Sequence, residues 1–205
     1  MRAPDGTYVV RLLLPPGFVP AEALRAVADL AERYGSGRVH LTVRQTIEIH
    51  GVRPERLRDL LRELRERGLE PGSTGPRVRQ ITCCPGADAC PNALDRTVPL
   101  ARRLHEEFAD VWVPAKVKIA VAGCPRGCTR PEDNDVGVLG LGNDRWRVLV
   151  GGVALGDRSG EEEVVETIER VLLWYARTAP MDERLKDLAA REAERLQEEL
   201  GVDDG

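Results

Sequence analysis

The sequence predicts an α+β fold, in which a small sandwich is followed by a second, larger α+β region. Over the first 70 residues, apolar strands and amphipathic helices alternate in the order strand–helix–strand–helix. This order is typical of a small sandwich, in which helices cover one face of one sheet. A segment rich in Gly and Pro follows at 70–76 and predicts a linker. All five cysteines lie after it. We therefore expect domains at 1–70 and 76–180, and a C-terminal helix at 181–205.

The first domain is predicted element by element. Residues 8–14 form an apolar run that ends at a Pro-Pro-Gly turn, which indicates a strand. Residues 20–35 begin with Pro, end with Gly and repeat apolar side chains at helical spacing. Residues 38–50 alternate apolar and polar side chains without a break and predict one long strand. Residues 54–68 predict a second helix, again between Pro and Gly.

The second region contains a further series of strands and helices. Its helix within 91–108 is expected to begin late or to be kinked, because Pro99 lies inside it. The other expected elements are a strand at 115–122, a hairpin of 136–141 and 146–150 that turns at 142–144, and helices at about 161–177 and 182–200.

The composition favours a globular protein of the cytoplasm. Hydrophobic residues make up 42% and charged residues 31%, which is ordinary for a soluble domain. The sequence lacks the run of about 18 apolar residues that a membrane span needs, and the N-terminus lacks the features of a secretory signal. We expect neither a membrane nor a nucleic acid as partner, since the net charge is −4 and aromatic residues make up only 4%.

Charge is unevenly distributed along the chain. Residues 1–160 contain 24 Lys and Arg against 20 Asp and Glu, whereas residues 161–205 contain 6 against 14. The basic surplus of the first part suits an anionic ligand. The acidic last part predicts solvated helices.

The cysteines carry the strongest chemical signal. Five is an odd number, which in a cytoplasmic chain disfavours disulfides and favours metal or redox chemistry. Cys84 and Cys90 are separated by five residues, and Cys124 and Cys128 by three. Four thiolates are what a [4Fe–4S] cluster requires, whereas zinc, the alternative, prefers pairs separated by two to four residues. Cys83 is left over and is expected to be a small buried hydrophobe.

This cysteine pattern, with Gly-Cys-Pro-Arg-Gly-Cys as its second half, resembles the cluster signature of siroheme-dependent sulfite and nitrite reductases. The resemblance extends over residues 7–190. It is carried by TVRQTIEIHG at 42–51, PAKVKIAVAGC at 114–124, DVGVLGLG at 135–142, WRVLVGGVALGDR at 146–158 and WYARTAPMDERL at 174–185. It implies a ferredoxin-like sandwich followed by a siroheme/[4Fe–4S]-binding α+β region.

The resemblance also implies roles for individual residues. The cluster would be held by Cys84, Cys90, Cys124 and Cys128, and Cys128 would also bind the siroheme iron. The substrate anion would be surrounded by Arg44, Arg79, Lys116 and Lys118, with Arg77 as the competitor for the role of Arg79. Further siroheme contacts are expected from Arg38, Gln45, His50, Arg126, Arg130 and Asn143.

The chemistry of the four basic side chains agrees with these implied roles. Cations attract a small oxyanion and stabilise the charge that leaves with its oxygens. Lys116 and Lys118 lie two residues apart, on one face of the predicted strand. An ammonium close to other cations has a lowered pKa, which makes it a competent proton donor.

The implied activity is the six-electron reduction of sulfite to sulfide. Electrons would come from an external donor, either a ferredoxin or a partner subunit. Alternatives are a nitrite reductase that forms ammonia, a monooxygenase-like protein of the precorrin-3B synthase type, a non-catalytic electron-transfer subunit and a zinc-stabilised binding module. The sequence does not separate sulfite from nitrite as substrate.

The resemblance further predicts a homodimer. The two-copy members of the family divide the cysteines and the substrate-side basic residues between their halves. This chain has one copy that contains both sets. We therefore expect a two-fold homodimer, in which Cys128 of one subunit faces the basic residues of the other.

Overall fold

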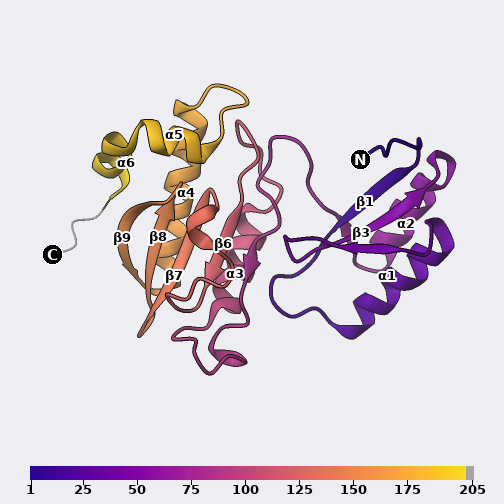
Figure 1. The fold of residues 1–205 in the computed structure, drawn as a ribbon, viewed down its shortest axis with the longest axis horizontal. Helices are drawn as coiled ribbons and strands as arrows, with labels where there is room; N and C mark the ends of the chain where they lie inside the picture. Colours follow the sequence, from indigo (N-terminus) through magenta and orange to yellow (C-terminus); the bar gives the residue numbers. More distant parts are fainter. Residues whose placement is uncertain (202–205) are drawn as a thin grey trace.

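The computed structural model describes residues 1–201, which form two lobes with one β-sheet each (Figure 1). This arrangement confirms the predicted α+β class. The elements of the first lobe are β1 (Tyr8–Leu13), α1 (Ala21–Tyr34), β2 (Val39–Leu41), β3 (Ile47–Val52), the short 3₁₀ helix η1 (Pro54–Arg56), α2 (Leu57–Glu66) and β4 (Glu70–Pro71).

The first lobe is the expected sandwich. Its sheet has the strand order β2-β3-β1-β4, and all its pairs are antiparallel. The helices α1 and α2 contact β3 and β4 and bury one apolar face of the sheet, where Leu12, Leu30, Ile49 and Leu60 are fully inaccessible to solvent. The predicted linker at 70–76 contributes β4, which pairs with the end of β1.

The prediction of one long strand over 38–50 is wrong. The chain turns back after β2, and β3 pairs antiparallel with it, with His40 opposite Glu48. The turn is closed by a hydrogen bond from the Thr42 backbone N–H to the Thr46 carbonyl oxygen, and Gln45 has a positive φ of 54°. The alternating pattern therefore describes a hairpin, and Arg44 lies at its tip instead of on a strand face.

The second lobe contains a five-stranded sheet in chain order. Its elements are β5 (Thr82–Cys83), η2 (Gly86–Asp88), α3 (Thr97–Phe108), β6 (Ile119–Ala122), η3 (Pro131–Asp133), β7 (Val136–Gly142), β8 (Arg145–Val150), β9 (Val153–Ser159), α4 (Gly160–Thr178), α5 (Leu185–Arg191) and α6 (Ala193–Leu200). The pairs β5–β6 and β6–β7 are parallel, and the pairs β7–β8 and β8–β9 are antiparallel.

Helices complete the core of the second lobe. The helix α3 begins late, as its proline predicted, and contacts β5 and β6, while α4 contacts β8 and β9. Trp146, Trp174 and Tyr175 are the largest side chains of this core that are almost fully buried. The hairpin of β7 and β8 turns at Asn143 and Asp144, both with positive φ, close to the predicted position.

Three details of the second lobe differ from the sequence prediction. The strand expected at 115–122 is regular only over β6, since before it only Val117 forms an isolated bridge. The strand β9 was not predicted. The helix expected at 182–200 is divided into α5 and α6 at Glu192, and the last part of the expected segment 181–205 lies outside the described residues.

No helix within residues 1–201 combines the length and the apolar character that crossing a membrane requires.

Candidate functional site

Two of the four predicted cluster cysteines follow neighbouring parallel strands. Cys84 comes directly after β5, and Cys124 is separated from the end of β6 by one glycine. Because parallel strands end at the same edge of a sheet, both thiols are brought to one edge of the second lobe. Cys90 follows η2, and Cys128 lies in the loop before η3. All five cysteines are unpaired.

Backbone hydrogen bonds join the cysteine loops. The Gly123 N–H donates to the Sγ of Cys84 at 3.2 Å, and the Gly123 carbonyl accepts from the N–H of Leu94 at 2.7 Å. The Cys90 N–H donates to the Gly86 carbonyl at 2.9 Å. The segments that carry Cys84, Cys90 and Cys124 are thus joined into one hydrogen-bonded unit.

Within residues 1–201, no three of the cysteine thiols lie as close together as the ligands of a zinc ion do. A tetrahedral zinc site with Zn–S bonds of about 2.3 Å places its sulfurs roughly 3.8 Å apart. Within residues 1–201, the one group of three metal-ligating side chains whose ligand atoms lie within 4.8 Å of one another is His40, Glu48 and His50, without a cysteine. A cluster holds its thiolates farther apart, because four irons lie between them.

The four predicted substrate-side residues line one cavity. We call it the basic cavity; its volume is about 270 Å³, and its walls include Arg11, Arg44, Arg79, Lys116 and Lys118. These residues come from β1, the β2–β3 turn, the segment before β5 and the segment before β6, so that both lobes contribute. The structure thus brings together residues that are up to 107 positions apart in the sequence.

A second cavity contains Cys128. We call it the cysteine cavity; its volume is about 480 Å³, and the predicted residues in its wall are Arg44, Gln45, Lys118, Cys128 and Arg130. Arg44 and Lys118 line both cavities. Within one chain, therefore, Cys128 already shares a cavity with two of the four predicted substrate-side residues.

Arg44 joins the two lobes. Its guanidinium donates to the Oδ1 of Asn134 at 2.8 Å and to the carbonyl oxygens of Gln80 at 2.6 Å and Ile119 at 3.0 Å. The Nε of Arg44 is buried and has no protein partner among the described residues. Burial lowers the pKa of Arg44 to about 10, so the side chain keeps its charge at neutral pH.

The other cations of the basic cavity influence one another. The pKa of Lys118 is lowered by burial first and then by Arg184 and Arg44, as expected for an ammonium among cations. Burial, followed by repulsion from Arg11, also lowers the pKa of Arg79. The guanidinium of Arg79 donates to the carbonyl oxygens of Ser73 and Gly75, which fixes it at the cavity wall.

Arg11 is a cation of the basic cavity that the sequence analysis missed. It is held by Glu48, whose Oε1 accepts from its Nε at 2.9 Å and its Nη2 at 2.5 Å. The other oxygen of Glu48 lies 2.9 Å from the Nδ1 of His40 and 3.4 Å from the Nε2 of His50. Burial raises the pKa of Glu48, but hydrogen bonds from His40 and Arg11 outweigh it, so the pKa is lowered.

A signal for Arg11 exists in the sequence. It is the one charged residue in the apolar strand β1. A lone charge in such a strand is costly unless a partner or a ligand meets it.

Gln45 connects the hairpin turn to the cysteines. Its side-chain amide accepts from the Cys83 N–H at 3.1 Å and donates to the Cys83 carbonyl at 2.8 Å. Cys83 itself is buried, as predicted, and burial raises its pKa to about 12.

The remaining predicted siroheme contacts line neither cavity. Arg38 and Arg126 are exposed, and His50 lies against Glu48. Asn143 lines a separate hollow at the β7–β8 turn. The structure does not bring these four residues together with Cys128 in one cavity.

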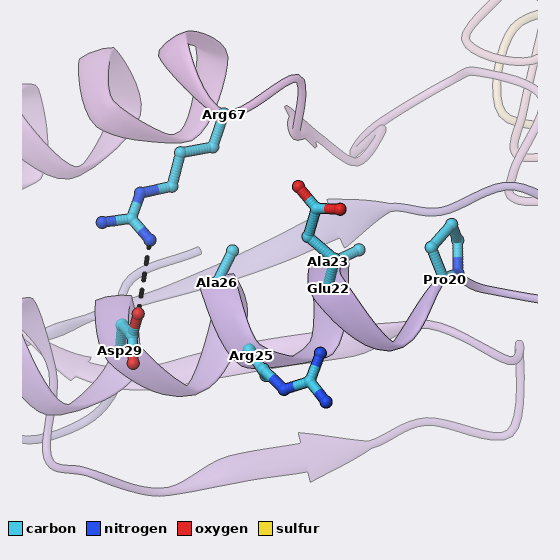
Figure 2. A pocket seen from close by; sticks show the side chains of 7 residues that line it. All are labelled: Pro20, Glu22, Ala23, Arg25, Ala26, Asp29 and Arg67. Carbon is cyan, nitrogen blue, oxygen red and sulfur yellow. Dashed lines mark hydrogen bonds and ion pairs between the residues drawn. The ribbon is translucent and has the colours of Figure 1, made fainter.

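Another hollow of about 480 Å³ lies on the outer surface of the first lobe (Figure 2). It is lined by residues of α1 and by Arg67, which forms an ion pair of 3.5 Å with Asp29 across it. None of the predicted site residues contributes to its wall.

Comparison with known proteins agrees with this site. Residues 1–67 match the nitrite/sulfite reductase ferredoxin-like half domain, and residues 74–203 match the nitrite and sulfite reductase 4Fe-4S domain. An uncharacterized protein of Methanocaldococcus jannaschii is 48% identical over 131 residues, which cover 64% of this chain and 47% of that protein. The coenzyme F420-dependent sulfite reductase of the same organism is 39% identical over 138 residues, 67% of this chain and 22% of that enzyme.

The chain spans less than half the length of these two relatives. The crystal structure of a dissimilatory sulfite reductase, DsrI, shares the fold with a TM-score of 0.85 and 18% identity, covering 96% of this chain and 69% of that one. The family match confirms the predicted cofactors, a [4Fe–4S] cluster and siroheme. The two matched domains together account for nearly all of the sequence, and the chain belongs to the nitrite and sulfite reductase family.

Proposed function

We propose that the chain reduces sulfite to sulfide at a siroheme coupled to a [4Fe–4S] cluster. The observation that carries this proposal is the basic cavity, in which the four cations named from the sequence converge with Arg11. Sulfite is a small dianion, and five cationic side chains around about 270 Å³ form a site of matching charge and size. The sulfite reductase among the relatives supports this choice of substrate.

Cys84, Cys90, Cys124 and Cys128 are the residues that would hold the cluster. Cys128 is the exposed member of the set and lines the cysteine cavity, so it is also the residue that would bind the siroheme iron. When bound, the two cofactors would pass on electrons from the external donor and provide a redox-active metal for the anion. Gln45 and Arg130, in the same cavity wall, are proposed siroheme contacts together with Arg38, His50, Arg126 and Asn143.

The chain's own residues bind the anion and supply protons. Arg79 and Arg44 are fixed by hydrogen bonds to backbone carbonyls, so they provide positive charge without reorganisation. Lys118, whose pKa is lowered by burial and by its cationic neighbours, can release a proton to an oxygen of the substrate. Lys116 lies in the same wall and contributes a second ammonium.

We further propose that two copies associate. The β2–β3 hairpin exposes Val39, Leu41 and Val43, with 44%, 74% and 97% of their surface accessible. Exposed apolar side chains on an edge strand and in the turn that follows it suit a second copy of the chain. Light scattering of the wild type and of a Leu41→Glu variant tests the proposal: the wild type is expected at twice the mass of the variant, and a monomeric wild type contradicts it.

Electrons are proposed to come from a separate ferredoxin or partner subunit, and the cytoplasm is the proposed location. Five cysteines that are all unpaired suit a reducing compartment.

The activity is tested on anaerobically purified protein. We expect the visible bands of siroheme, iron with acid-labile sulfide, and sulfide formation with reduced methyl viologen as donor. Lys118→Ala is expected to lower kcat/KM for sulfite by about 100-fold, as for loss of a general acid, whereas Lys186→Ala, an exposed lysine outside both cavities, is the matched control. A higher kcat/KM for nitrite than for sulfite would assign the chain to nitrite reduction instead. Colourless protein that contains zinc would refute the proposal.

A further inference from the structure

The C-terminal part of the chain reaches the lysines of the basic cavity through a buried ion pair. Arg184, the residue before α5, donates from Nη2 to both carboxylate oxygens of Asp135, at 2.8 and 2.6 Å. The side chain of Asp135 is fully buried, and that of Arg184 is 22% exposed. A buried carboxylate without such a partner is strongly destabilising, so this pair is a fixed feature of the lobe.

Asp135 also holds the backbone of Lys118. Its Oδ2 accepts from the Lys118 N–H at 2.9 Å, and the Lys118 carbonyl accepts from the N–H of Val136 at 3.0 Å. Both peptide groups of Lys118 are therefore bound to the start of β7. A third contact lies nearby, because the hydroxyl of Tyr175 accepts from the Ala115 N–H and donates to the carbonyl of Glu183. The segment that carries both cavity lysines is thus fixed at its two ends.

We propose that Asp135 and Arg184 are positioning residues that hold Lys118 in the wall of the basic cavity. The inference rests on the proposed function for the role of Lys118 as proton donor, but its geometry does not depend on turnover. Because the two charges of the pair compensate each other, the pair orders the lysine segment without adding net charge beside the substrate.

The pair also sets the charge balance around the Lys118 ammonium. The charged groups that act on Lys118 are Arg44, Lys116, Asp135 and Arg184. The other titratable groups around it are Arg11 and Arg79 in the wall of the basic cavity, and Cys128, Arg130 and Asp133 in the wall of the cysteine cavity, which Lys118 also lines. After burial, Arg184, Arg44 and Lys116 lower the pKa of Lys118, and Asp135 raises it. Removal of one member of the pair leaves the other uncompensated, so the two single substitutions act in opposite directions.

Competitive acetylation of the amines measures this directly. The chain has only three lysines, 116, 118 and 186, and each is quantified by peptide mass spectrometry after trace labelling with acetic anhydride at several pH values. Only the unprotonated amine reacts, so the labelling rate follows the state of the ammonium. Lys186 is exposed and serves as the internal reference. The experiment uses the holoprotein.

In Arg184→Gln, Asp135 is left uncompensated. We therefore expect the labelling rate of Lys118, relative to that of Lys186, to be lower than in the wild type by a factor of about three or more. In Asp135→Asn, which keeps an oxygen for the Lys118 N–H, we expect faster labelling by a similar factor. Arg184→Lys is expected to restore the wild-type rate. Changes of opposite sign in the Lys118 labelling rate of the two variants cannot arise from partial unfolding, because unfolding would bring Lys118 and Lys186 to the same labelling rate.

Circular dichroism identifies which variants are folded, and either folded single variant decides the question. Unchanged Lys118 labelling in a folded variant, or a change of the same sign in both, would overturn the inference. Failure of the proposed sulfite reduction is distinguishable, because labelling requires no substrate. Absence of turnover with opposite labelling shifts would refute the role of Lys118 and leave its positioning intact.

Discussion

Replacement of Arg44 by Ala tests whether this residue joins the two lobes. The wild-type guanidinium makes three hydrogen bonds to neutral acceptors in the second lobe. Hydrogen bonds from a charged donor contribute about 1.5–3 kcal/mol each, but neighbouring bonds are not additive. The substitution also removes the buried Nε that has no partner, and this offsets about 1 kcal/mol of the lost hydrogen-bond stabilisation. We therefore expect Arg44→Ala to lower the free energy of unfolding by about 3 kcal/mol.

Arg130→Ala is the matched control. Arg130 also lines the cysteine cavity, but its side chain is 76% exposed and forms only a surface ion pair with Asp133. Such pairs contribute less than about 1 kcal/mol. Urea denaturation followed by tryptophan fluorescence, on equally loaded preparations, compares the two variants. An equal loss of unfolding free energy in both variants would refute the view that Arg44 is anchored to the second lobe. It would indicate that the Arg44 side chain is free to enter the cavity.

Three further predictions concern the first lobe and the cysteines. Because the pKa of Glu48 is lowered in the folded state, its contribution to stability is present above its ordinary pKa and is lost as the pH falls through the folded value. Glu48→Gln abolishes the ion pair with Arg11, so we expect the urea midpoint of this variant to depend less on pH between about pH 3 and 7 than that of the wild type. An equally steep pH dependence in both proteins would contradict this. Cys83→Ala is expected to keep the iron and acid-labile sulfide content, whereas Cys84→Ser is expected to lose it; equal content in both variants would exclude Cys84 as a ligand. Gly123→Ala places a methyl group 2.8 Å from a backbone carbonyl oxygen, so we expect reduced cluster content by iron analysis, and full content would show that the loop can yield.

Local sequence patterns predicted most of the elements because proline and glycine mark their ends. The helices α1 and α2 begin after Pro20 and Pro54, and the late start of α3 follows from Pro99. The hairpin of β2 and β3 was missed because its turn contains no Gly, Pro or Asn. The positive φ of Gln45 is accompanied by hydrogen bonds to Cys83, which is 38 residues away. No local pattern contains that contact.

The candidate site was predicted largely through the family resemblance. The resemblance named Arg44, Arg79, Lys116 and Lys118, and the structure places all four around one cavity. Residue spacing alone predicted that the two lysines lie on a regular strand. In the structure that strand begins only at Ile119, after both lysines. The contribution of Arg184 could not be predicted, because it depends on a contact with Asp135, which lies 49 residues earlier in the chain.

The parallel arrangement of β5, β6 and β7 has a consequence for how this protein can change in length. The positions of Cys84 and Cys124 are determined by where two adjacent strands end, so they do not depend on the connection from α3 to β6 at the opposite edge. That connection, at 109–118, carries both cavity lysines close to β6, but its first residues, around the exposed Trp112, pair with the segment 76–78 and not with the cysteine loops. Extra residues inserted there are expected to be tolerated by the redox centre, whereas a single insertion between Cys124 and Cys128 would shift one ligand relative to the other three.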